Sequence, residues 1–320
     1  MGSKSSEEIV DRGRKLMLIN LLSRAMMMST PLLFGALSEV FSERTGMMVT
    51  AIEGIFLMGA WAGFTAAYIT GSLGLGLLFA ALAGLLVSIL YAFICVNLKQ
   101  HQIVTGTAIN ILIAGLCSFL QRVVFGVPLS PLTVEPLKKI AVPLLSKIPA
   151  LGTILFTQNI LTYAVYVLVP LGYFVLYKTS IGLTIRATGE NPESVDVSGI
   201  NVSKVRFIAV MFSGVMGGIA GAFYSIGYLG MYTSSIIGGR GWIAFAICFL
   251  GNWNPVGAFI GTLIFGLAEA FAILMQSSAG ITLPNEIFIA LPYILTIVLT
   301  ITRKSFNVPE KLGTAYIKEN

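Results

Sequence analysis

The chain is dominated by apolar runs long enough to cross a lipid bilayer. Of its 320 residues, 56% are hydrophobic and 11% are charged, whereas a soluble domain carries about a quarter charged residues. A soluble protein of this size would need a charged surface, which these runs do not leave. Because a membrane-spanning helix needs roughly 20 apolar residues, the sequence predicts an all-α, polytopic membrane helix bundle with about 8–10 transmembrane segments. The apolar segments cover approximately residues 16–37, 47–70, 75–98, 103–125, 159–177, 205–229, 242–250, 256–275 and 287–301.

Two of these regions contain breaks and resemble each other. Residues 242–276 would form a helix of about 50 Å, too long for a hydrocarbon core of about 30 Å. The sequence GNWNP at 251–255 favours a turn there, because proline ends a helix, and GSLG at 71–74 favours a similar break. Each region then gives a short segment, a turn and a helix of small residues, which indicates a possible internal repeat. Glycine pairs four residues apart predict close helix packing at 59/63, 214/218, 217/221 and 257/261.

The charge distribution separates a membrane domain from two polar ends. The formal charge is +6, and Lys and Arg lie mainly at the termini and in connecting loops, as the positive-inside bias predicts, which gives no indication of nucleic-acid binding. We expect a cytoplasmic-side or interfacial N-terminal segment (1–15), a transmembrane domain (16–302) and a cytoplasmic tail (303–320). The loop at 126–157 should lie outside and the loop at 179–204 in the cytoplasm. Counting crossings back from the tail, either a short or re-entrant segment precedes Leu98 or the N-terminus is outside.

Catalytic and metal-binding motifs are absent from the sequence. No Gly-Lys pair is followed by Ser or Thr, which excludes the usual phosphate loop, and His101 is the single histidine. The three cysteines, Cys95, Cys117 and Cys248, lie inside apolar runs and form no CxxC pair. We therefore expect no enzyme activity, no metal site and no cofactor bound by this chain.

One polar stretch, TSIGLTIRATGENPESVDVSGINVSKVR at 179–206, interrupts the apolar sequence. Asn191 is a good helix N-cap, Pro192 suits the first helical position, and Gly199 can end the helix. Glu193 and Asp196 favour the positive end of the helix dipole. The stretch therefore predicts a helix of about two turns, which needs a surface to pack on because so short a helix is marginal alone. It is either a solvated loop or a docking helix for a cytoplasmic partner.

Four stretches together resemble the permease subunits of ATP-binding-cassette importers, in the branch of the ribose, branched-chain amino acid and nucleoside permeases. They are ERTG with EG at 43–46 and 53–54, GTAIN at 106–110, RATGENP at 186–192, and GRGWIAFAICFLGNWNPVG at 239–257. The resemblance spans residues 30–300. It implies a multi-pass protein of a bacterial cell membrane that pairs with a second related permease, a cytoplasmic ATPase and an extracellular solute-binding protein. ATP would be bound by the ATPase, and the cargo would be a small polar solute.

The resemblance also implies which residues act. The family's loop on the ATPase would correspond here to Arg186, Glu190, Asn191, Pro192, Glu193, Asp196 and Gly199. Polar and aromatic residues in or near the apolar segments could contact the solute, or could instead serve helix pairing and interface anchoring. These substrate-pathway candidates are Glu53, Asn110, Gln121 and Trp242.

Three hypotheses for the function stay open from the sequence. GENPESVDVSGINV and IPALGTILFTQ resemble the nucleoside permeases most, and simple sugars such as ribose are the second choice of substrate. Family members commonly carry Asn-Ile/Leu-Gly where this chain has Val49, Thr50 and Ala51, and that difference bears on the substrate. The third hypothesis is a stand-alone secondary transporter in which Glu53 or Glu269 carries protons.

Overall fold

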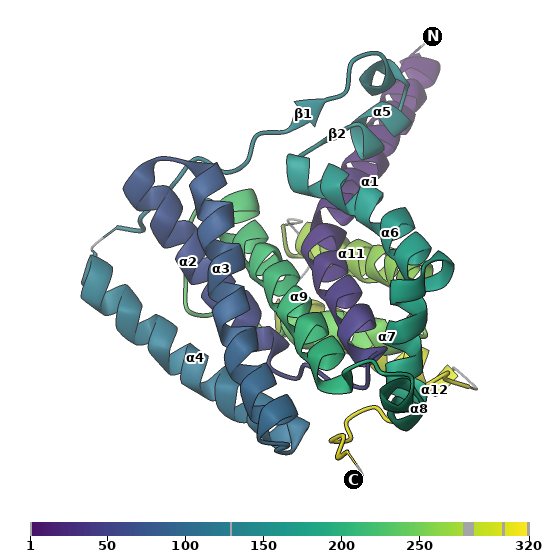
Figure 1. Cartoon of the computed structure of the whole chain (residues 1–320). Coiled ribbons are helices and arrows are strands. Elements are labelled where there is room, and N and C mark those ends of the chain that lie inside the picture. The colour runs from purple at the N-terminus through teal and green to yellow at the C-terminus, as the bar shows by residue number, and fades with distance from the viewer. Residues whose placement is uncertain (1, 129, 278–284, 303–304, 319–320) are drawn as a thin grey trace.

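Two long helices that run in opposite directions, α1 (Gly2–Glu43) and α9 (Val202–Ala222), form the centre of the structure (Figure 1). The computed structural model describes residues 2–128, 130–277, 285–302 and 305–318. Midway along its length α1 meets the long loop 126–157, where Ser23 Oγ donates to the Thr153 carbonyl at 3.3 Å. α9 instead ends near that loop, where the Val134 amide donates to the Gly230 carbonyl at 2.8 Å. α1 and α9 are thus inverted relative to each other.

Each long helix packs against a hairpin from the other half of the chain. The first hairpin is α2 (Ile52–Thr70) with α3 (Leu73–Ala92), and the second is α10 (Arg240–Leu250) with α11 (Pro255–Ser277). The α2–α3 hairpin packs on α9, and the α10–α11 hairpin packs on α1. Both turns fall where the sequence predicted breaks. This exchange of hairpins between the two halves agrees with the predicted internal repeat. Because α1 and α9 run in opposite directions, the repeat is an inverted one.

The remaining elements surround this centre. α4 (Gln102–Phe125) packs mainly on α2, and α12 (Asn285–Thr302) packs on α11. Wide π-type turns, η1 (Phe93–Asn97) and η3 (Phe223–Leu229), extend α3 and α9. α6 (Ile160–Lys178) leads into α7 (Ser180–Glu190) and α8 (Pro192–Val197). The loop 126–157 carries β1 (Ile140–Ala141), η2 (Leu145–Lys147) and α5 (Leu151–Leu155), and β1 pairs antiparallel with β2 (Thr157–Gln158).

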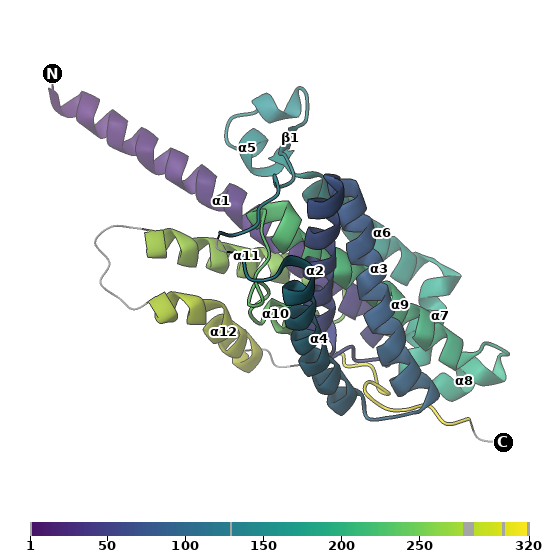
Figure 2. The ribbon, with the colours of Figure 1, turned by 90° about the vertical axis from the view of Figure 1, so that its left-hand side faces the viewer.

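The predicted all-α membrane bundle is confirmed. In the described residues, seven helices are long and apolar enough to cross a membrane, and two shorter apolar helices at 240–250 and 290–301 accompany them. The total lies within the predicted range. The start of α1 and the C-terminal tail lie at opposite ends of the bundle (Figures 1 and 2), which fits an odd number of crossings. Which side of the membrane each terminus faces stays a prediction.

Glycines let α9 approach α2 and α3 at backbone distance. A Cβ atom at Gly218 would lie 2.2 Å from the Ala80 carbonyl oxygen, and one at Gly221 would lie 1.8 Å from the Phe56 carbonyl oxygen. A Cβ at Gly59 would in turn meet Gly218 at 2.3 Å. Close packing is confirmed for these glycines. Gly257 behaves differently, because its near neighbour is Gly251, across the α10–α11 turn.

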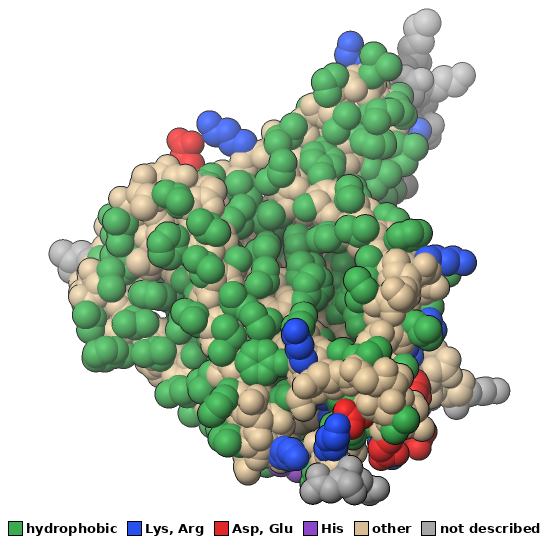
Figure 3. Space-filling view, viewed as in Figure 1, with side chains coloured by type: hydrophobic (Ala, Val, Ile, Leu, Met, Phe, Trp, Pro, Cys, Tyr) green, Lys and Arg blue, Asp and Glu red, His purple; other side chains and the backbone are tan. Residues whose placement is uncertain are grey.

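The surface is apolar around the middle of the bundle and charged at the end that carries α8. In Figure 3 hydrophobic side chains cover the central face, while basic and acidic side chains gather at the lower end, near α8 and the C-terminal tail. We refer to this end as the α8 end. The distribution is the one expected of helices that are surrounded by lipid along their length and by water at their ends.

Candidate functional site

The polar stretch 179–206 contains α7, α8 and the first turn of α9. α8 begins as the sequence predicted: Asn191 Oδ1 accepts from the Ser194 amide at 3.0 Å, and Pro192 is the first helical residue. Gly199 has a φ of +84°, a conformation that glycine adopts without strain, and it ends the helix. The sequence predicted no helix before Asn191, whereas residues 180–190 form α7. Thr179 caps α7 by accepting from the Gly182 amide at 3.2 Å.

α8 presents an apolar residue to the outside. Pro192 and Val195 are buried against the bundle, whereas Val197 is 89% exposed. Ile200, just after the helix, is 38% exposed. A short helix held from below with an aliphatic side chain pointing outward is suited to insertion into a groove of a partner protein.

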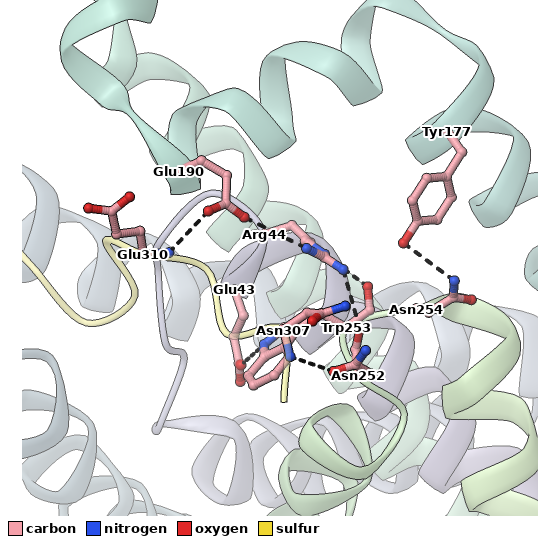
Figure 4. A network of polar contacts seen from close by, with 9 residues as sticks. All are labelled: Glu43, Arg44, Tyr177, Glu190, Asn252, Trp253, Asn254, Asn307 and Glu310. Atoms are coloured by element: carbon pink, nitrogen blue, oxygen red, sulfur yellow. Dashed lines mark hydrogen bonds and ion pairs between the residues drawn. The ribbon is translucent and has the colours of Figure 1, made fainter. Parts of the chain in front are cut away.

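Arg44, in the α1–α2 turn, contacts both the α10–α11 turn and the α7–α8 corner (Figure 4). Its Nε donates to the Trp253 carbonyl at 2.9 Å and its Nη2 to the Asn252 carbonyl at 3.3 Å, in the α10–α11 turn. Its Nη1 lies 4.0 Å from Glu190 Oε1, at the end of α7. The Trp253 indole donates in turn to the Glu43 carboxylate. The α1–α2 turn, the α10–α11 turn and the α7–α8 corner therefore form one unit, in which hydrogen bonds join the two turns and a long ion pair joins the corner to Arg44.

The C-terminal tail (305–318) is built into the same unit. The Lys311 amide donates to the Gly189 carbonyl at 2.9 Å, and the Gly313 amide donates to the Gly46 carbonyl at 3.0 Å. Arg206 links the tail to the α1–α2 turn. Its Nε donates to the Thr45 carbonyl at 3.0 Å, and its Nη1 donates to the Thr314 carbonyl at 2.8 Å. No local pattern in the sequence predicts this role, because Gly46, Gly189 and Arg206 each lie more than a hundred residues from their partners in the tail.

An ion pair fixes the end of the tail to α8. Lys318 Nζ lies 2.9 Å from Asp196 Oδ2. The hydrogen bond from Lys318 lowers the pKa of Asp196, and the Asp196 carboxylate raises the pKa of Lys318. The pair therefore stabilises the docked tail above the usual carboxyl pKa, and this contribution is lost as the pH falls through the lowered pKa of Asp196. At alkaline pH it is lost as the pH rises through the raised pKa of Lys318.

Asp196→Asn should release the end of the tail without unfolding α8, because it removes only the charge that Lys318 contacts. We expect faster amide hydrogen exchange at residues 314–318 and unchanged exchange in α8, measured at neutral pH. Glu193→Gln removes a charge one turn earlier and is the control. If the control and Asp196→Asn exchange alike, the ion pair does not hold the tail.

Arg186 also lies in this region but faces the bundle. Its guanidinium is 5.1 Å from the centre of the Tyr177 ring, a cation–π contact. The Tyr177 hydroxyl lies 3.4 Å from Asn254 Nδ2, which extends the contact to the α10–α11 turn. Of the predicted docking residues, those at the surface are Glu190, Asn191, Glu193 and Gly199.

The predicted substrate-pathway residues Glu53 and Asn110 cap two helices that begin inside the bundle. Glu53 Oε1 and Oε2 accept from the Gly239 and Gly241 amides, both at 2.8 Å, at the start of α10. Asn110 Oδ1 accepts from the Gly54 amide and its Nδ2 donates to the Thr50 carbonyl, both at 2.8 Å, at the start of α2. α2 and α10 occupy matching places in the two halves, so their N-termini meet near Glu53. Such meeting points are where inverted-repeat transporters bind their cargo.

The two other candidates lie apart from this junction. Gln121 Oε1 accepts from the Trp61 indole at 3.2 Å, between α4 and α2. Trp242 is 39% exposed and packs edge-on against Phe245 within α10. Contact of these four residues with solute stays a prediction.

The sequence as a whole matches a known family. A family model described as "Branched-chain amino acid transport system / permease component" covers residues 21–300. The chain belongs to this family. It is therefore a multi-pass membrane transport permease, and the family resemblance inferred from the four sequence stretches is confirmed.

Relatives of this permease match nearly its whole length. It is 38% identical to a nucleoside ABC transporter permease of Lactococcus lactis, over 93% of this chain and 96% of that one. It is 36% identical to a guanosine ABC transporter permease of Bacillus subtilis, over 91% and 94%. A putative glucose ABC transporter permease of Haloferax volcanii is 32% identical over 83% and 80%. The fold is similar to a solved putative metal-chelate type ABC transporter in an inward-facing conformation, with a TM-score of 0.50, 18% identity and coverage of 89% and 87%.

Proposed function

We propose that this permease is the membrane subunit of an ATP-driven importer for nucleosides. The relatives described as nucleoside and guanosine permeases align along more than nine-tenths of the chain, which supports nucleosides over simple sugars. The single structural observation that carries the coupling role is Val197, which is 89% exposed on a short helix that Lys318 of the tail contacts at Asp196.

In this proposal the α8 end faces the cytoplasm and binds an ATPase subunit. Basic residues lie at both ends, since the start of α1 and the loop 126–157 also carry them, so this orientation rests on α8 and its exposed surface. The α8 end carries Lys99, Lys178, Arg186, Lys204, Lys311 and Lys318. The ATPase would bind and hydrolyse ATP. A second related permease would complete the pathway, and an extracellular binding protein would deliver the solute.

The proposed mechanism transmits ATPase closure through Arg44. A push on α8 would move the α7–α8 corner, and through Arg44 both the α1–α2 turn and the α10–α11 turn. The α1–α2 turn precedes α2 and the α10–α11 turn follows α10. These are the two helices whose N-termini meet inside the bundle. Movement at the ATPase would thus reach the two helices together and open the junction to one side or the other.

The secondary-transporter hypothesis has less support. Glu53 is occupied by two amide donors, and Glu269 is paired with Arg240 at 2.6 Å. A proton carrier would have to leave these partners in each cycle, and the hypothesis gives α8 no role.

Transport by the reconstituted complex tests the proposal. Proteoliposomes that contain the permease with its genomically neighbouring ATPase, second permease and binding protein should take up labelled guanosine when supplied with ATP. We expect unlabelled nucleosides to compete and ribose to have no effect at equal concentration. An ion gradient without ATP should drive no uptake. Uptake of ribose but not guanosine would favour the sugar hypothesis, and gradient-driven uptake without ATP would favour the secondary carrier.

A further inference from the structure

A cavity of about 350 Å³ lies between α10, α11 and α12, close to the point where the two half-chains meet. It has the size of a small-molecule site. Its wall combines an ion pair, an amide and an aromatic ring with aliphatic side chains, from Arg240, Glu269, Ile273, Gln276, Pro292 and Tyr293. We propose that this cavity holds the nucleoside during translocation, with Glu269 accepting hydrogen bonds from it and Tyr293 stacking on its base. The inference rests on the proposed function and specifies its site.

The ion pair leaves a carboxylate oxygen for a ligand. Arg240 Nε and Nη2 lie 2.8 Å and 2.6 Å from the same atom, Glu269 Oε1. The guanidinium is fixed further by its Nη1, which donates to the Ile237 carbonyl at 3.1 Å, and by the Tyr224 ring, whose centre is 5.2 Å away. The contacts described for the Glu269 carboxylate thus end on Oε1. Because Glu269 lines the cavity, its second carboxylate oxygen, Oε2, can accept a hydrogen bond from an N–H or O–H group of a solute.

Placing charged groups inside membrane-spanning helices costs desolvation free energy, so their presence there indicates a functional role. Ionised groups inside membrane helices are rare, are almost always paired, and mark solute pathways. The side chains of Arg240 and Glu269 are 32% and 12% exposed, so the pair borders open space and is not sealed within the packing.

The charges of the site favour an uncharged solute. A helix N-terminus usually attracts anions, but the positive end of α10 is already occupied by the Glu53 carboxylate. Arg240 is likewise neutralised by Glu269. Two carboxylates and one guanidinium leave the junction with an excess of negative charge. We therefore expect nucleosides to enter and nucleoside monophosphates to be rejected.

The aromatic wall suits a nucleobase. The Tyr293 hydroxyl donates to the Gly238 carbonyl at 2.9 Å, which fixes the ring beside the start of α10. The side chain is 40% exposed, so part of the ring is free for contact. Every base has a flat π-face, so stacking on an aromatic side chain contributes to the binding free energy of any nucleobase.

Substitution of the ring and of the carboxylate tests the site in the complete reconstituted transporter. Tyr293→Leu should raise the KM for guanosine about 10-fold, within the range that stacking on one aromatic residue gives. Tyr293→Phe should raise it less, because the stacking face remains. Glu269→Gln should also raise it about 10-fold by removing a charged acceptor. Phe271→Leu is the matched control, because Phe271 lies on α11 outside the cavity and is 41% exposed.

A labelling experiment covers the case in which Glu269→Gln fails to assemble. Gln276→Cys places a thiol at the cavity wall and leaves the ion pair intact, and the native cysteines are buried. Guanosine should slow its reaction with a maleimide, whereas guanosine monophosphate at the same concentration should not.

The outcomes separate the site from the function. If the unaltered complex takes up guanosine but Tyr293→Leu keeps its KM within twofold and guanosine gives no protection, the site is wrong and the proposed function stands. If the unaltered complex takes up no nucleoside at all, both are wrong. Equal protection by guanosine and its monophosphate would overturn the selection for uncharged solutes.

Discussion

Replacing residues 190–198 by a Gly/Ser linker of equal length abolishes ATP-driven uptake and ATPase binding, while the chain still inserts into the membrane. This is the largest effect that we expect. The linker removes the cap at Asn191, the Arg44 contact at Glu190 and the exposed Val197 at once. Copurification of the ATPase with the permease from detergent, followed by uptake in proteoliposomes, measures it. Retained ATPase binding would remove the docking role of α8.

A single substitution tests the same surface more sharply. Val197→Asp should weaken ATPase binding by about 2–4 kcal/mol, as burial of an unpaired charge at the centre of an interface does. Val127→Asp is the matched control, since Val127 is 86% exposed in the loop at the opposite end of the bundle. Equal loss for the two variants would show that an added carboxylate harms the permease by some other route.

Gly218→Ala is expected to destabilise the bundle by about 1–3 kcal/mol, the usual cost of forcing an extra carbon into a packed core. The added Cβ would lie 2.2 Å from the Ala80 carbonyl oxygen, and backbone cannot yield as a flexible side chain can. α3 and α9 would have to separate. The measurement is the midpoint of thermal unfolding in detergent.

The control for Gly218→Ala is Gly115→Ala on α4, where a Cβ would meet nothing within 4 Å. Alanine favours a helix by about 1 kcal/mol over glycine, so this variant should be neutral or slightly more stable. A loss of stability as large as that of Gly218→Ala would mean that steric fit at α9 is not the cause.

The parts of the structure that depend on local chemistry could be predicted from the sequence. Asn191, Pro192 and Gly199 each act on the backbone within three or four residues, so their spacing was enough to place α8. The turns at 71–72 and 251–254 follow from glycine, asparagine and proline in the same way. α7 was missed because its threonines and glycines are weak helix formers. Its helix depends on the Thr179 cap and on packing.

The long-range parts of the sites could not be predicted. Arg240 and Glu269 are 29 residues apart, and only the α10–α11 turn brings them together. Asn110 and Glu53 were identified correctly as polar residues inside the membrane domain. Their bonds to Gly54, Gly239 and Gly241 are set by how the inverted halves meet, which no local pattern encodes. The tail's bonds to Gly189 and Gly46 belong to the same class.

The exchange of hairpins between the halves has a consequence for biosynthesis. α1 packs on α11, whose residues leave the ribosome roughly two hundred positions later, a delay of about 10–40 s at 5–20 residues per second. During that interval the nascent α1 carries Ser38, Glu39 and Glu43, all fully enclosed in the finished molecule, without the surfaces that will enclose them. The insertion machinery or its accessory chaperones must shelter this helix from lipid, and neither half of the chain can mature before the other has been translated.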